Sequence, residues 1–142
     1  MATKFDAEKY TTASKVKDFY SDIPTNLDIH PGTKDVLRVR NDQAIIQSVR
    51  NLILTDMNER PFQPKVGSSI RQALFEPISP ITSHAIRIAI EDVLNNYEPR
   101  VEMLDTVVEP DEMADGYYVH LKFALINKIE PVEIDLFLDR NR

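Results

Sequence analysis

The 142-residue sequence contains no cysteine and only three glycines, Gly32, Gly67 and Gly116. Without cysteine, the chain cannot form a disulfide, a thiolate nucleophile or a zinc–thiolate site. Three glycines so far apart cannot build a phosphate-binding loop or a dinucleotide fingerprint. We therefore expect no cofactor, no metal and no small-molecule substrate.

The sequence also lacks long apolar runs and an excess of positive charge. No stretch approaches the roughly 20 apolar residues that a membrane-spanning helix needs, and the opening MATKFDAEKY has no signal-peptide core. The chain has 17 Lys and Arg against 23 Asp and Glu, a net charge of −6. This balance disfavours attraction to nucleic-acid phosphates and to anionic lipid. We expect neither nucleic acid nor a membrane as partner, and the absence of cysteine fits synthesis in a reducing cytosol.

Hydrophobic periodicity predicts an α+β fold with one main domain. Residues 1–32 read as a flexible N-terminal arm followed by a loop, and residues 33–142 as the single domain. Apolar residues at three- and four-residue steps predict two main helices, whereas alternation predicts strands. The expected elements are a strand over 35–40, helices over 41–56, 68–75 and 80–97, and strands over 101–109, 116–126 and 131–139. We expect a small antiparallel sheet, made of the C-terminal meander plus the N-terminal strand, to pack against the helices.

The last expected strand bears on function because it leaves an open sheet edge. Val132, Ile134 and Leu136 alternate with the acidic Glu133 and Asp135, so the apolar residues face inward. An uncovered edge presents unpaired amides and carbonyls. Charge protects such an edge, or a partner's strand docks on it.

No catalytic constellation stands out. The histidines, His30, His84 and His120, have no metal-ligand spacing, and no serine lies in a G-x-S-x-G turn. Carboxylates are plentiful, but no two are identifiable as the pair that glycoside hydrolysis needs. We therefore expect a protein that is not an enzyme, without catalytic residues.

The tripeptide Glu98–Pro99–Arg100 lies between the longest helix and the first strand of the meander. Pro99 cannot continue a helix, so the helix must end near Tyr97 with two opposite charges around a fixed corner. Two interpretations remain open on physical grounds. The tripeptide is a stop signal with a local ion pair, or it is a docking site for a partner.

Two stretches, NERPFQPKVGSSIRQALFEP at 58–77 and NYEPRV at 96–101, resemble the baseplate wedge protein family of contractile phage tails. The type VI secretion baseplate has a similar subunit. The resemblance covers residues 33–139, and the chain departs from the usual pattern at QPKVGSS. The matching residues are Arg60, Pro61, Phe62, Gly67, Ile70, Leu74, Phe75, Glu76, Pro77, Glu98, Pro99 and Arg100.

The resemblance implies a structural subunit of the virion tail baseplate that is assembled in the host cytoplasm. It implies that Glu98, Pro99 and Arg100 dock on other baseplate wedge proteins, through an exposed pair of charges. It also implies that arms of the tail sheath protein add strands to the sheet. We expect this addition at the edge formed by Val132, Ile134 and Leu136. The tail hub or tube is a further possible contact.

The remaining motif residues are expected to be structural, with Phe62 and Phe75 packed in the core. Because the family has also carried a lysozyme label, a peptidoglycan-degrading hydrolase is the alternative function. A generic scaffold or adaptor protein outside phage is a third hypothesis for the function.

Overall fold

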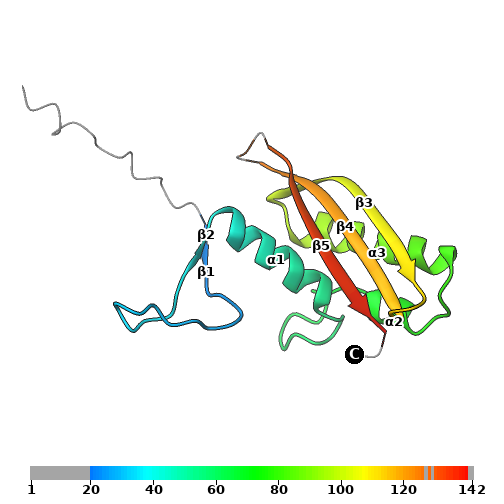
Figure 1. Cartoon of the computed structure of the whole chain (residues 1–142), viewed down its shortest axis with the longest axis horizontal. Helices are drawn as coiled ribbons and strands as arrows, with labels where there is room; N and C mark the ends of the chain where they lie inside the picture. The colour runs from blue at the N-terminus through cyan, green and yellow to red at the C-terminus, as the bar shows by residue number, and fades with distance from the viewer. Residues whose placement is uncertain (1–19, 127, 129, 141–142) are drawn as a thin grey trace, which may run out of the picture.

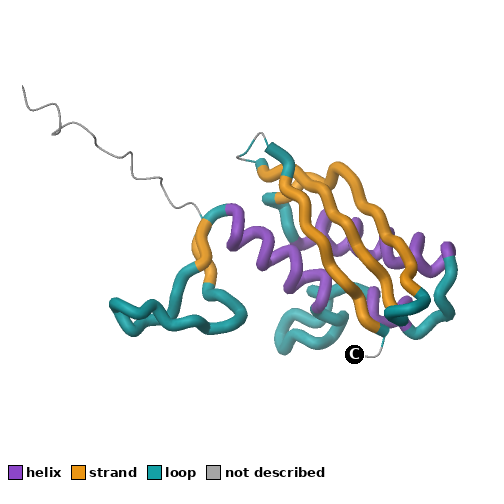
Figure 2. Tube along the Cα trace, viewed as in Figure 1, coloured by secondary structure: helices purple, strands orange, loops and turns teal. Residues whose placement is uncertain are grey.

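The computed structural model describes residues 20–126, 128 and 130–140, and it confirms the α+β class. A three-stranded antiparallel sheet carries helices on one face (Figures 1 and 2). The helices and meander strands, in chain order, are α1 (Asp42–Leu54), α2 (Ile70–Leu74), α3 (Pro80–Tyr97), β3 (Val101–Asp111), β4 (Gly116–Leu125) and β5 (Val132–Asp139).

The predicted meander is present, with β4 in the centre and β3 and β5 at the two edges. Leu121 of β4 pairs with Thr106 of β3 on one side and with Ile134 of β5 on the other. Alternate residues of β4 are buried, because one face of the sheet packs on the helices and the other faces solvent. Among the described residues, no strand pairs with the outer side of β3 or β5.

The core lies between the sheet and the helices. Helix α3 begins where the sequence predicts: Ser79 Oγ accepts a hydrogen bond from the Thr82 amide at 3.2 Å, and Pro80 occupies the first turn. Asn41 stands at the start of α1 but makes no side-chain capping bond. The largest fully buried side chains include Ile53, Ile86, Ile90, Leu94, Tyr117, Leu121 and Phe123.

The N-terminal strand differs from the prediction. Only Val39–Arg40 (β2) is a strand, and it pairs with Ser21–Asp22 (β1) in a separate ribbon instead of joining the meander. Asn41, with φ of 49°, turns the chain directly into α1, so β2 stays at the start of that helix (Figure 1). Most of the expected flexible arm, residues 1–19, lies outside the described residues, and the domain boundary at residue 33 stays a prediction.

Candidate functional site

The corner at Glu98–Pro99–Arg100 joins α3 to β3. The helix ends as predicted: the Glu98 amide bonds to the Leu94 carbonyl at 2.9 Å, and the chain turns so that the Val101 amide bonds to the Glu98 carbonyl at 3.2 Å. Pro99, between these bonds, has no amide to donate and is exposed. The backbone of the corner is therefore fixed by hydrogen bonds on both sides of the proline.

The docking hypothesis expected an exposed pair of charges, but Glu98 is buried, with only 2% of its surface accessible to solvent. Its carboxylate accepts two hydrogen bonds from Arg100, from Nε at 2.5 Å and Nη2 at 2.6 Å, and a third from Ser48 Oγ at 2.7 Å. A buried carboxylate needs such partners, which is the physical reason that it points inward. Burial acts to raise the pKa of Glu98, but the bonds from Arg100 and Ser48 outweigh it, and the pKa is lowered.

Arg100 is the member of the pair that reaches solvent. Its side chain is 33% exposed, and its guanidinium carbon lies 5.1 Å from the centroid of the Tyr20 ring. The two bonds to Glu98 use Nε and Nη2, so Nη1 takes no part in them. Glu98 and Tyr20 together hold the guanidinium in one orientation.

The loop over residues 55–69 is tied to the end of α3. Tyr97 Oη donates to the Lys65 carbonyl at 2.5 Å, and the Ser68 amide bonds to the Thr55 carbonyl at 2.8 Å. Gly67 is required at the base of the loop, because a Cβ there would lie 2.4 Å from the carbonyl oxygen of Asp56. The loop is thereby held close to its own base and to the corner.

These contacts bring both family-like stretches to one cavity of about 530 Å³, the corner cavity. Arg60 enters it from the loop, and Arg100 from the corner. Arg60 makes no ion pair with any described residue, whereas Arg100 is paired with Glu98. The lining residues are Asp22, Ser48, Asn51, Leu52, Arg60, Gln63, Val66, Tyr97, Glu98, Pro99 and Arg100.

Phe62 and Phe75 were expected in the core, and this prediction is wrong. Phe62 is 102% exposed and Phe75 is 75% exposed. Phe62 stands in the loop between exposed prolines, and Phe75 follows the short α2, which buries Ile70 instead. Of the other motif residues, Gly67 is buried, while Pro61, Glu76 and Pro77 are exposed.

The edge strand β5 has the expected alternation. Ile134 is buried, while Val132 and Leu136 are half-buried on the same side. The acidic residues on the opposite side pair across the sheet with β4: Glu133 lies 2.7 Å from Lys122 Nζ, and Asp135 lies 2.6 Å from His120 Nδ1. Both carboxylates therefore have a partner on the neighbouring strand.

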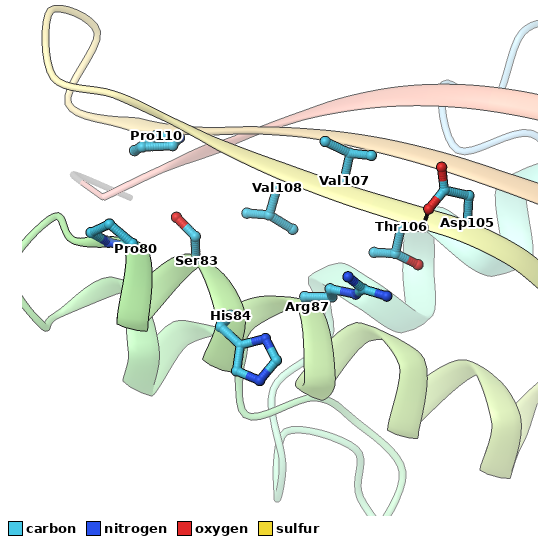
Figure 3. Close-up of a pocket in the computed structure, with 9 residues that line it drawn as sticks. All are labelled: Pro80, Ser83, His84, Arg87, Asp105, Thr106, Val107, Val108 and Pro110. Carbon is cyan, nitrogen blue, oxygen red and sulfur yellow. Dashed lines mark hydrogen bonds between the residues drawn. The ribbon is translucent and has the colours of Figure 1, made fainter.

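A second cavity, of about 390 Å³, lies between α3 and the edge strand β3 (Figure 3). Thr106 lines it with a buried hydroxyl that has no hydrogen-bond partner among the described residues, and Arg87 Nε donates to the Glu91 carboxylate at 2.9 Å. Figure 3 shows the His84 ring directed away from the strand and from Ser83, so His84 is not placed to act as a base toward the Ser83 hydroxyl.

Within the described ranges, no three His, Asp or Glu residues gather closely enough to bind a metal ion. None of the described helices has the length and apolarity that a membrane span requires.

Comparison with known proteins gives consistent matches. The family described as baseplate wedge protein gp25 matches residues 39–129. Baseplate wedge protein gp25 of Enterobacteria phage T4 is 31% identical over 122 residues, which cover 84% of this chain and 90% of that protein.

Two solved structures share the fold. A chain in the six-fold symmetrised cryo-EM structure of the anti-feeding prophage baseplate has a TM-score of 0.60 at 20% identity, over 87% of each chain. A crystal structure of a tail-lysozyme candidate from Geobacter sulfurreducens has a TM-score of 0.57 at 24% identity, over 67% of this chain and 88% of that one.

Proposed function

Because the chain belongs to the baseplate wedge protein gp25 family, we propose that it is a structural subunit of a contractile-tail baseplate and that it docks there through the corner cavity. Membership in this family places it among structural wedge proteins rather than enzymes. Its place is the tail baseplate of the virion, and its partners are other baseplate proteins.

The observation that carries the docking site is the convergence of two separated sequence stretches on one cavity. Arg60 contributes a guanidinium that forms no ion pair within the described part of the chain, and Arg100 contributes the donors that Glu98 does not use. Guanidinium groups bind carboxylates, and they also bind the carbonyls at the C-terminal end of a helix. We infer that the partner presents such acceptors.

In this proposal the three corner residues have different roles. Arg100 and Pro99 contact the partner, because they reach the surface. Glu98 acts from inside by fixing the Arg100 side chain, so that less conformational entropy is lost on docking.

A second surface is proposed for the tail sheath protein, at the outer edge of β5. Three features support it: the edge is unpaired among the described residues, Val132, Ile134 and Leu136 share one side of the strand, and the nearby acids are engaged across the sheet. An extended segment added there would gain main-chain hydrogen bonds along the strand. A further contact with the tail hub or tube is part of the proposal, but we assign it no residues.

Arg60→Glu tests the docking site without disturbing a pair in the fold. The chain is co-expressed with the other wedge proteins of the same tail, and the complex is isolated through a tag on this chain. We expect Arg60→Glu to weaken association by about 30-fold or more, since it places a repulsive charge at the contact.

The matched control is Arg50→Glu, the same charge change on an exposed α1 residue outside the cavity lining. Equal binding by wild type, Arg60→Glu and Arg50→Glu would remove the cavity as the docking site. If wild type itself failed to associate with any wedge protein, the proposed function would be wrong.

A further inference from the structure

Phe62 is the most exposed large apolar side chain of the loop at 55–69, and its backbone is in the left-handed region, with φ of 68°. A bulky aromatic residue in that region is a steric outlier, because its Cβ crowds the following carbonyl. The side chain gains nothing in return within the chain, since it buries no surface. Strain combined with full exposure points to a role outside the isolated chain.

The conformation is held by the loop itself. The Asn58 amide bonds to the Pro64 carbonyl at 2.8 Å, closing the segment around Phe62, and the Gln63 amide bonds to the Arg60 carbonyl at 3.3 Å. Pro61 and Pro64 restrict the backbone on both sides. The Tyr97–Lys65 bond fixes the loop to the end of α3. Phe62 is therefore presented on a stiff support.

The location of Phe62 identifies the class of its partner. Arg60 and Gln63, on either side of it in sequence, line the corner cavity together with Arg100. A protein that occupies the cavity must pass beside this loop. Rigid, exposed aromatic residues are the side chains that most often anchor protein interfaces, because they bury much area for little lost entropy.

We propose that Phe62 is an apolar anchor that enters a pocket on the wedge protein occupying the corner cavity. The partner's pocket is lined by apolar side chains and carries a carboxylate at its rim, opposite Arg60. This inference rests on the proposed docking function of the cavity, and it extends that interface from the corner onto the loop.

Phe62→Ala is compared with Phe75→Ala in the co-expressed wedge complex. Both changes remove an exposed ring, but Phe75 lies outside the cavity lining and has ordinary helical backbone angles. We expect Phe62→Ala to weaken association by about 30-fold, as for a central interface aromatic. We expect Phe75→Ala to bind like wild type and Phe62→Leu to recover most of the loss.

The thermal midpoints of the isolated variants separate binding from folding. Phe62 buries nothing in the chain, so Phe62→Ala should melt within about 2 °C of wild type. Wild-type binding by Phe62→Ala would overturn the anchor. If Arg60→Glu still weakened binding in that case, the docking cavity would stand and only the anchor would fail.

A photo-crosslinking residue, p-benzoylphenylalanine, placed at position 62 gives a direct readout in the assembled complex. We expect a crosslink to a second kind of wedge protein. The same probe at the exposed position Met113 serves as the comparison. A crosslink at position 62 only to another copy of this chain, or none at all, would overturn the proposal.

Discussion

Replacing Arg100 with Met removes one partner of the buried ion pair and leaves the other in place. In this variant the Glu98 carboxylate, at 2% exposure, loses both guanidinium hydrogen bonds and keeps the one from Ser48. Breaking a buried pair in this way typically costs about 3–5 kcal/mol. We expect about 3 kcal/mol, the low end, because the Arg100 side chain is 33% exposed and water replaces part of its contribution.

The assay is urea unfolding of the isolated chain, followed by far-UV circular dichroism at pH 7. The slope of the unfolding free energy against urea concentration should be the same in the variant as in wild type. The shift in midpoint then reports the change in stability alone. A loss of about 3 kcal/mol corresponds to a melting temperature about 10 °C lower for a domain of this size.

The double variant Glu98→Gln with Arg100→Met is the control, because it removes both charges. It should be more stable than Arg100→Met alone, by about 1 kcal/mol or more, since no uncompensated carboxylate stays buried. A single-variant loss below about 1 kcal/mol, or a double variant that is the less stable of the two, would refute this account of the corner.

Three further predictions concern the fold and are checked by the same unfolding assay. The lowered pKa of Glu98 means that its contribution to stability is present above the ordinary carboxyl pKa and is lost as the pH falls through the folded-state value; Glu98→Gln should flatten the acid limb of the stability curve, and an unchanged acid limb would contradict the assignment. Tyr117→Phe should leave stability unchanged or raise it by about 1 kcal/mol, because the buried Tyr117 hydroxyl has no partner among the described residues, and a clear loss would mean that this hydroxyl is bonded. Gly67→Ala should cost about 2–3 kcal/mol, because its Cβ would lie 2.4 Å from the Asp56 carbonyl oxygen, and wild-type stability would show that the loop base is loose.

Local signals explain which parts of the fold the sequence predicts well. Helix α3 has a capping serine, a proline in its first turn and a proline just after its end, so both ends are specified by neighbouring residues. The meander strands follow from period-two alternation. The prediction for the N-terminal strand was wrong because a short β-branched run does not specify which strand it pairs with.

The candidate site was predictable in its residues but not in its arrangement. The sequence at 98–100 shows that two charges flank a proline. It does not show that Glu98 is buried, because one of the hydrogen bonds that stabilise the buried carboxylate comes from Ser48 on helix α1. Aromatic residues are usually buried, so Phe62 was assigned to the core. The signal against that assignment was local: Pro61 and Pro64 bracket it and indicate a loop. Nothing in the sequence predicts that Arg60 and Arg100 line one cavity.

A cryo-EM structure of the assembled baseplate tests the central claim most directly, by measuring how exposed the corner cavity is within the complex. The account predicts that Arg60, Pro99 and Arg100 lose their solvent exposure against a different wedge protein, with Glu98 still paired to Arg100. A baseplate in which this chain is held through another surface, with the cavity facing solvent, would contradict it.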